Sequence, residues 1–431
     1  MQIAEKMRVL VLGSGGREHA LVARLASDPG VSVLCAPGNP GIARIAPVFP
    51  VNLADPSSIA ELAAREQVDL TVVGPELPLS VGVADRFAAD GRVLLGPTAA
   101  AARLETSKAY AKAFMERHGV PTARFHTAES ADDALAVVRG GSFGFPVVLK
   151  ADGLAVGKGV VIAQTLAEAE EAIAAAMTGG RFGSAGERLV IEECLFGPEV
   201  SFFVLCDGVR ALPIGTAQDH KRIFDNDEGP NTGGMGAFAP SPLVDAALHA
   251  RVMREIVDPV LAGMAAEGHP FKGFLYVGLM LTASGPKVIE FNVRLGDPEA
   301  QVILPRIAEP LAPLFVAAAE GRLTQESCAM TAGTMVGVVI ASHGYPETAE
   351  SGQVISGIEA AERLGVMVRH AGTAARDGAI VTAGGRVLTV VAGGASFAEA
   401  IASAYAGVRA ISFDGMQYRS DIGRKALLAQ S

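Results

Sequence analysis

At 431 residues, half of them hydrophobic and 19% charged, the chain is long enough for about three domains with packed cores. Its net charge of −10 argues against nucleic acid as a partner, because the phosphate backbone attracts basic surfaces. The four cysteines are scattered, and no apolar run approaches 18 residues, which argues against a disulfide framework and a membrane anchor. We therefore expect a cytoplasmic protein with no nucleic-acid or membrane partner.

The first hundred residues alternate between apolar strands and helices. This alternation is typical of a doubly wound α/β domain, whose parallel strands are covered by helices on both faces. We therefore predict a Rossmann-like domain over residues 1–106. Its expected elements are strands 8–12, 31–35, 70–73 and 93–95 and helices 17–26 and 57–66.

The first strand ends in a glycine turn, 13–16, that resembles a dinucleotide fingerprint. NAD and FAD are disfavoured, because the third glycine position is Glu18 and the second strand ends at Cys35 without a ribose-binding acid. Free N–H groups at the start of the next helix would still suit a single phosphate. Ordinary tight turns are the alternative. Two more turns, 39–41 and 74–76, follow strands at the same edge of the sheet. The predicted substrate-binding residues of these three turns are Gly15, Gly16, Asn39, Gly41, Pro75 and Glu76.

A glycine-rich loop, 151–159, joins two further predicted strands, 146–150 and 160–163. It is not a Walker A loop, because no Ser or Thr follows Lys158 and the next element is a strand, not a helix. Such a hairpin can fold over nucleotide phosphates, as the glycine loop of kinases does, or it can be an ordinary surface hairpin. The candidate ATP-binding residues are Lys150, Gly157 and Lys158 in this unit and Lys108 near the start of the expected helix 107–118.

A charged strand end follows at 188–193. Backbone groups at such a hinge can bind an adenine edge, and an acid a few residues later can bind ribose hydroxyls. A plain charged strand end is the alternative. The hinge predicts nucleotide contacts from Glu192, Glu193, Leu195 and Glu199. Residues 207–240 are expected to be rich in loops, and the polar, glycine-rich stretches 219–222 and 231–236 favour a functional role for them.

The segment 288–299 predicts a strand that ends at a Gly-Asp-Pro turn. A period of two places Glu290, Asn292 and Arg294 on one face, with about 7 Å between successive backbone positions. The carboxylate and the amide oxygen can bind Mg²⁺, and the guanidinium can stabilise an anion at the edge of the metal. A half-buried strand with its polar face outward is the alternative.

These patterns divide the remaining chain into two parts. We predict a central domain over residues 107–325, with 123–196 as a mobile nucleotide lid, and a small C-terminal α/β domain over 326–431. The expected helices are 107–118, 165–177, 245–267, 358–364 and 396–410, and the expected strands are 199–205, 273–281, 287–293, 334–341, 379–383 and 387–391.

Five stretches together resemble the phosphoribosylamine–glycine ligase family of the ATP-grasp superfamily. They are residues 13–20, 150–159, 218–222, 229–237 and 290–299. The resemblance runs from about residue 7 to residue 425, and the stretches 229–237, 370–373 and 384–388 make it specific to this family. Cys194 departs from it, standing where the family usually has an aromatic residue, and 196–198 replaces a more acidic turn. Both departures concern the adenine hinge, where backbone groups make the contacts.

The resemblance implies a central ATP-grasp domain and an ATP-dependent ligase of purine biosynthesis. Such a ligase joins glycine to 5-phosphoribosylamine through a glycyl phosphate and gives glycinamide ribonucleotide, ADP and phosphate. It further implies Mg²⁺ or Mn²⁺ on Glu290 and Asn292, and a monomer or weak dimer with small-molecule substrates only. The implied catalytic residues are Arg294, Asp219 and Lys221, and substrate contacts are also implied for Asp219, Arg294, Gly296 and Asp297.

Two other readings stay open at this point. Another ATP-grasp ligase, of the carboxylating or formyl-phosphate type, would share Glu290, Asn292 and Arg294. The carboxylating type is disfavoured, because no acid precedes Glu290 on the strand 275–281. A dinucleotide-binding module would need only the N-terminal fold, and it is disfavoured by Glu18.

Overall fold

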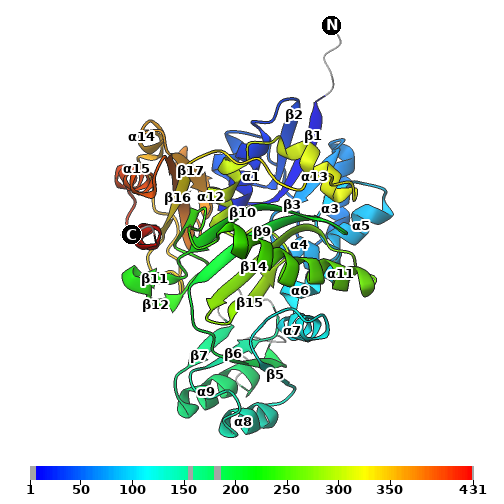
Figure 1. Cartoon of the computed structure of the whole chain (residues 1–431). Helices are drawn as coiled ribbons and strands as arrows, with labels where there is room; N and C mark the ends of the chain where they lie inside the picture. The colour runs from blue at the N-terminus through cyan, green and yellow to red at the C-terminus, as the bar shows by residue number, and fades with distance from the viewer. Residues whose placement is uncertain (1–5, 154–158, 179–185, 430–431) are drawn as a thin grey trace.

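The computed structural model describes residues 6–153, 159–178 and 186–429. Its N-terminal part is a four-stranded parallel sheet in the order β2-β1-β3-β4 with helices on both faces, at the top of Figure 1. The elements are β1 Met7–Gly13, α1 Gly16–Leu25, β2 Val31–Pro37, α2 Pro40–Ala43, α3 Pro56–Arg65, β3 Leu70–Val73, α4 Glu76–Ser80, α5 Val83–Ala89, β4 Leu94–Leu95 and α6 Ala99–Thr106. The predicted doubly wound arrangement is confirmed.

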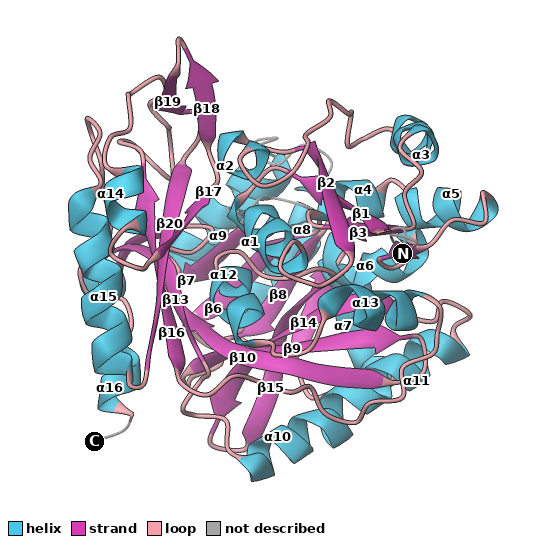
Figure 2. Cartoon of the chain, turned by 90° about the horizontal axis from the view of Figure 1, so that it is seen from above, coloured by secondary structure: helices cyan, strands magenta, loops and turns pink. Residues whose placement is uncertain are grey.

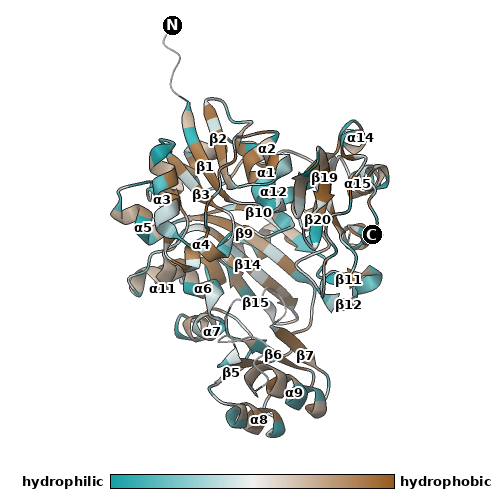
Figure 3. Ribbon diagram, turned by 180° about the vertical axis from the view of Figure 1, so that it is seen from behind, coloured by the Kyte–Doolittle hydropathy of each residue, from teal (hydrophilic) through white to brown (hydrophobic). Residues whose placement is uncertain are grey.

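Alternate side chains of β1 enter two different cores. Leu10 and Leu12 pack in the cluster that contains helices α3 and α5, whereas Val9 and Val11 pack in the cluster that contains α1. A parallel sheet covered on both faces needs such a continuous apolar run. The brown strands in Figure 3 show the same pattern.

A separate four-stranded antiparallel unit projects from the lower side of the molecule in Figure 1, with the strand order β5-β8-β6-β7. Helix α7 Lys108–Arg117 leads into it, and its elements are β5 Phe125–Ala128, α8 Ala131–Arg139, β6 Val147–Ala151, β7 Val160–Ala163, α9 Leu166–Ile173 and β8 Leu189–Glu193. The Thr165 side chain caps α9 by accepting the Glu168 N–H at 3.3 Å. In a capping box the Glu168 carboxylate would accept the backbone N–H of Thr165. Here it accepts the N–H of Gln164, one residue before the cap.

The centre of the molecule is an eight-stranded sheet in the order β15-β14-β9-β10-β13-β16-β20-β17. Its central elements are β9 Glu199–Asp207, β10 Ala211–Asp219, β11 Arg222–Phe224, β12 Glu228–Asn231, β13 Gly236–Ala239, α10 Ala246–Val252, α11 Asp258–Ala266, β14 Lys272–Thr282, β15 Gly285–Asn292, α12 Glu299–Ile303 and α13 Leu311–Ala319. The expectation that 207–240 is rich in loops is wrong, because four strands occupy most of it. Three of these strands are only three or four residues long, and glycine, proline and polar residues hide the alternation there.

Successive phenylalanines on β9 show how this sheet is covered. Phe202 packs with the helical segment around Ile256 and Val260, and Phe203 packs on the other face with α12 and α13. The long helix predicted at 245–267 is present as α10, a π-helical segment Met253–Val257 and α11.

The last third of the chain extends the same sheet. Strand β13 pairs with β16, so the C-terminal strands continue the central sheet without a break. Helix α15 runs along β16 and β20, as Figure 2 shows. The elements are β16 Thr334–Ala341, α14 Ile358–Glu362, β17 Met367–His370, β18 Thr373–Arg376, β19 Ala379–Thr382, β20 Arg386–Gly394, α15 Phe397–Ala410 and α16 Arg424–Leu428. Within the three described ranges, no helix is long and apolar enough to cross a membrane.

Three histidines are buried in this framework. His19 on α1 and His370 on β17 meet where the N-terminal and C-terminal parts touch, and His19 Nδ1 accepts the His370 N–H at 2.8 Å. His220, after β10, packs edge-on against Phe238, and neither ring nitrogen has a hydrogen-bond partner in the described part of the chain. Burial lowers the pKa of His19 to about 2 and those of His220 and His370 to about 4.

These lowered pKa values predict that the fold loses stability in mild acid. Below pH 6.5 a histidine of the unfolded chain binds a proton, whereas the buried His220 stays neutral until about pH 4. In that window each such histidine lowers the free energy of unfolding by about 1.4 kcal/mol for each pH unit of acidification. His220→Phe should make urea unfolding less sensitive to acid by about that slope between pH 6 and pH 4.5. The exposed His269→Gln should match the wild type. Parallel pH profiles for His220→Phe and the wild type would contradict the assignment.

Candidate active site

A pocket of about 350 Å³ opens where the central sheet, the four-stranded unit and the N-terminal turns meet. Its described lining is rich in charge of both signs. The basic residues are Arg17, Lys108, Lys112, Lys150, Lys221, Arg294 and Arg386, and the acidic ones are Glu76, Glu105, Glu192, Asp219, Glu290, Asp297 and Glu299. Lysines and arginines in this number suit a polyanionic ligand, while the acids can bind a cation and accept protons.

Strand β15 brings the predicted metal-binding residues into the pocket. Glu290 and Asn292 both line it, and Arg294 lines it two residues further on. Ile289 and Phe291, which a period of two places on the opposite face, also border the pocket, and a β-bulge at Ile289 interrupts the pairing with β14. The Ile289 carbonyl accepts a hydrogen bond from Lys150 Nζ at 3.0 Å.

Glu105, at the end of α6, orients two of these side chains. Its carboxylate binds Arg294 Nη2 at 2.8 Å and the Val293 N–H at 2.7 Å. The Asn292 amide fits its surroundings only with Nδ2 toward Glu105, at 3.1 Å, and toward the Phe291 carbonyl. That orientation turns the Asn292 oxygen away from Glu105, as a metal ligand requires.

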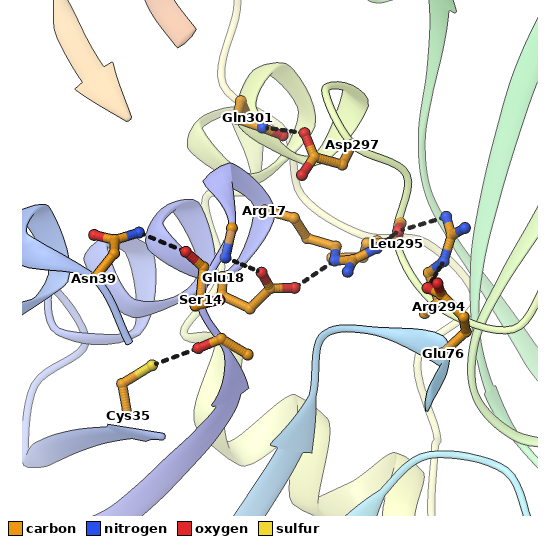
Figure 4. Close-up of polar contacts among 12 residues, drawn as sticks. Ser14, Arg17, Glu18, Cys35, Asn39, Glu76, Arg294, Leu295, Asp297 and Gln301 are labelled. Atoms are coloured by element: carbon orange, nitrogen blue, oxygen red, sulfur yellow. Dashed lines mark hydrogen bonds and ion pairs between the residues drawn. The ribbon is translucent and has the colours of Figure 1, made fainter. Parts of the chain in front are cut away.

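The guanidinium of Arg294 lies between two carboxylates from the N-terminal part. It pairs with Glu105. It also pairs, at 3.3 Å, with Glu76 at the start of α4, as Figure 4 shows. Burial alone would lower the pKa of Arg294, but Glu105 and Glu76 raise it, so the group stays charged. In the described residues the guanidinium makes no ion pair with Asp297 or Glu299, the two acids that follow it in the sequence.

Three lysines cluster on the other side of the pocket. Lys150 and Lys112 both pair with the buried Glu192, at 2.9 and 3.0 Å. Lys108 Nζ donates to the Gly153 carbonyl at 2.8 Å. Burial lowers the pKa of Lys108, and it lowers that of Lys112 to about 8. The predicted ATP-binding lysines Lys108 and Lys150 thus face the pocket, whereas Gly157 and Lys158 fall outside the described residues.

The predicted adenine hinge lies at the end of β8. The Glu193 carboxylate binds Arg124 at 2.7 Å and Lys287 at 3.2 Å. Burial alone would raise the pKa of Glu193, but these two partners outweigh it and lower the pKa to about 2. Leu195 is half-buried, and Glu199 binds Lys221 at 2.6 Å. Of the four hinge residues, Glu192 alone belongs to the described lining, so nucleotide binding by the other three stays a prediction.

The glycine turn after β1 is closed by a carboxylate of its own helix. Glu18 accepts the Gly15 N–H at 2.6 Å and binds Arg17 Nε at 2.6 Å, and Arg17 reaches the Leu295 carbonyl at 3.0 Å (Figure 4). A Cβ at Gly13 or at Gly74 would collide with the Glu18 side chain. One N–H group of this turn, that of Gly15, is therefore already bonded.

Asn39 and Gly41 likewise make contacts within the fold. The Asn39 amide donates to the carbonyls of Ser14 and His370 at 2.8 and 2.9 Å, and its oxygen caps α2. A Cβ at Gly41 would lie 2.5 Å from the His370 ring. Of the ten predicted substrate-binding residues, Glu76, Asp219, Arg294, Gly296 and Asp297 line the pocket. Gly15, Gly16, Asn39, Gly41 and Pro75 are not in the described lining, and their roles stay predictions.

The C-terminal part contributes Arg386, at the start of β20. Its Nη1 donates to the carbonyls of Gly233 and Asp297, both at 2.6 Å, and so joins two pocket loops. Gln301 holds the Asp297 carboxylate at 2.7 Å. Arg386 and Arg17 outweigh burial and lower the pKa of Asp297.

Seven charged or aromatic lining residues were missing from the sequence-based assignment: Arg17, Glu105, Lys112, Tyr276, Phe291, Glu299 and Arg386. Arg17 follows the glycine turn, and Glu299 ends the segment that carries the metal residues, so local signals for these two existed. Glu105 and Lys112 are ordinary helical residues in the sequence. Tertiary packing alone brings them to the pocket.

The pocket lies between a four-stranded antiparallel unit and a larger antiparallel sheet. Lysines line one side of it, and the carboxylate–amide pair of Glu290 and Asn292 lies on β15 of the larger sheet. This arrangement defines an ATP-grasp protein. The chain belongs to the phosphoribosylglycinamide synthetase family. Its residues 7–105 match the N domain of that family, 106–300 the ATP-grasp (A) domain and 335–425 the C domain.

Named relatives and solved structures agree with this assignment. A phosphoribosylamine–glycine ligase of Xylella fastidiosa is 52% identical over 98% of this chain and 99% of its own length. One from Ralstonia nicotianae is 50% identical over 98% and 100%. The crystal structure of the Thermotoga maritima ligase is 35% identical, covers 96% of this chain and 99% of its own, and has a TM-score of 0.85. Biotin carboxylase of Campylobacter jejuni, at 16% identity, 99% and 95% coverage and a TM-score of 0.72, shares the fold alone.

Proposed function

We propose that the protein joins glycine to 5-phosphoribosylamine with ATP, giving glycinamide ribonucleotide, ADP and phosphate, the second step of de novo purine biosynthesis. The observation that carries this proposal is the full-length match to one family together with Glu290, Asn292 and Arg294 in one pocket. We place this activity in the cytoplasm, with small molecules as the only partners of a monomer or weak dimer.

The chemistry explains why the pocket needs both ATP and so many charges. A carboxylate does not react with an amine at neutral pH, because oxide would have to leave. Transfer of the γ-phosphoryl group to the glycine carboxylate gives glycyl phosphate, from which phosphate leaves readily. Lys108 and Lys150 would neutralise phosphate oxygens, and Arg294 would stabilise the acyl phosphate and the oxyanion formed from it. Positioning and electrostatics carry the rate, and no side-chain nucleophile is needed.

Glu290 and Asn292 fit a hard divalent cation, Mg²⁺ or Mn²⁺. The Asn292 oxygen is turned away from Glu105, and no described lysine or arginine pairs with Glu290. Within the described ranges no cluster of three His, Cys, Asp or Glu side chains could hold a metal alone. That suits an ion bound by one or two protein oxygens and the phosphates of its substrate. When bound, the ion would offset the charge of the β- and γ-phosphates.

Omitting each substrate in turn tests this reaction class. We expect ADP release only when ATP, glycine and phosphoribosylamine, formed in the assay from ribose 5-phosphate and ammonia, are all present. Bicarbonate or formate in place of glycine should give background rates. ADP formation that needs bicarbonate or formate and ignores glycine would assign the chain to another type of ATP-grasp ligase.

A further inference from the structure

Glu299 is a pocket carboxylate to which the reaction described so far gives no role. It begins α12, two residues after Asp297, and it lines the pocket while only 4% of the residue is exposed. A Cβ at Gly296 would lie 2.5 Å from Glu299 Oε2, so the glycine makes room for this carboxylate beside Arg294. The predicted substrate residue Gly296 is thus explained by its acidic neighbour.

Most of the other pocket acids are already engaged. Glu76 and Glu105 pair with Arg294, Glu192 pairs with two lysines, and Asp297 is held by Arg386 and Gln301. Among the described lining residues, three acids remain without an ion pair, namely Asp219, Glu290 and Glu299. Glu290 is the proposed metal ligand. A carboxylate free to gain a proton must therefore be Asp219 or Glu299.

The surroundings of Glu299 keep it close to protonation. Ser201 on β9 gives it one hydrogen bond, at 3.2 Å, and the same hydroxyl lies 3.2 Å from the Tyr276 oxygen. Burial, and after it the charge of Asp219, raise the pKa of Glu299. The charged and titratable groups that act on it are Asp219 at the end of β10, Lys221 between β10 and β11, Tyr276 on β14 and Arg294 after β15. An acid poised in this way suits proton transfer near neutral pH.

The proposed reaction has a proton that needs an acceptor. The amine nitrogen forms a bond to the acyl carbon with its lone pair, and the carbonyl electrons move to oxygen. The nitrogen is then positively charged. It must lose a proton before the C–O bond to phosphate breaks, because otherwise the amine would leave again.

We propose that the Glu299 carboxylate accepts this proton from the attacking amine, with Ser201 as its positioning residue. This inference rests on the proposed function. In the balanced step the N–C bond forms, the C–O bond to phosphate breaks, phosphate leaves with the bonding electrons, and the proton passes to Glu299 and then to solvent. Arg294 stabilises the oxyanion that forms at the same carbon.

Glu299→Gln tests the inference, because glutamine keeps the size and the Ser201 contact but accepts no proton. We expect kcat at pH 8 to fall by about a hundredfold or more, the usual contribution of a general base. The ratio of wild-type to variant kcat should shrink toward one as the pH falls, because a protonated Glu299 is no better than glutamine. This ratio cancels the titration of the amine itself. Glu309→Gln, outside the pocket lining and likewise bonded to a single neutral donor, the Ala329 N–H, should keep the wild-type profile.

Ser201→Ala provides a second test that leaves the carboxylate in place. The Ser201 bond favours the ionised form of Glu299, so its loss should move the acid limb of kcat to higher pH by about half a unit. The proposal would be overturned if Ser201→Ala left the acid limb of the kcat–pH profile unmoved, or if the profile of Glu299→Gln ran parallel to that of the wild type. It would also be overturned if Asp219→Asn, and not Glu299→Gln, removed the acid limb. A wild-type protein that ignores glycine would overturn the proposed function, which separates the two failures.

Discussion

Glu290→Ala is expected to lower kcat by about a thousandfold while leaving the fold intact. A bound divalent ion contributes several kcal/mol to a phosphoryl-transfer transition state, and each 1.36 kcal/mol is a factor of ten in rate. Glu290 has no ion pair in the described structure, so its removal leaves no buried cation without a partner. Initial rates of ADP release at saturating substrates, with thermal unfolding beside them, measure both quantities.

Glu359→Ala is the matched control for this change. Glu359 is an exposed acid on α14, in the C-terminal part and outside the described pocket lining. It should keep both turnover and melting temperature. If Glu290→Ala instead lowered the melting temperature sharply and kept turnover, Glu290 would be a structural acid and the metal assignment would be wrong.

Arg294→Lys should cut turnover by about a hundredfold or more without weakening the binding of ATP. Lysine keeps the charge but loses the planar fork that suits an acyl phosphate or oxyanion, and loss of one oxyanion donor costs this much. One ammonium cannot replace both contacts, to Glu76 and to Glu105, so some stability should also be lost. Calorimetry with ATP alone and kcat measured well below the melting temperature keep these effects apart.

Arg103→Lys serves as the control for the loss of a guanidinium nearby. Arg103 lies on the same helix as Glu105, but its guanidinium stacks over the Tyr110 ring, at 4.1 Å, outside the described pocket lining. This variant should turn over at close to the wild-type rate. Weakened ATP binding with near-normal turnover in Arg294→Lys would place Arg294 on the nucleotide.

The sequence predicts those parts of the fold where local pattern and packing agree. Strand β1, the capped helix α9 and the C-terminal helix α15 occur close to the expected positions, because apolar periodicity and capping residues mark them. Strands β10 to β13 were missed, since β11, β12 and β13 are only three or four residues long and the segment is rich in glycine, proline and polar residues. The continuity of β13 with β16 could not be predicted, because pairing between segments about a hundred residues apart leaves no local pattern.

In the candidate site too, residues marked by a local pattern were predicted and residues brought in by tertiary packing were not. Glu290, Asn292 and Arg294 were found because one strand carries them at a fixed spacing. Glu105, which orients two of them, lies on another element, and its neighbours along the chain give no sign of this role. The Glu18 carboxylate at the Gly15 N–H is a contact that the sequence did not predict, made to the glycine turn from within the following helix, and the role of the turn stays a prediction.

The central claim is that ATP activates the carboxylate of glycine, and an oxygen-label experiment tests it most directly. Glycine with ¹⁸O in both carboxylate oxygens would be converted in unlabelled water, and the phosphate would be examined by mass spectrometry. Because the bridging oxygen of glycyl phosphate leaves with phosphorus, we predict one ¹⁸O in each phosphate and one in each glycinamide ribonucleotide. Unlabelled phosphate, formed together with ADP and product, would contradict the account.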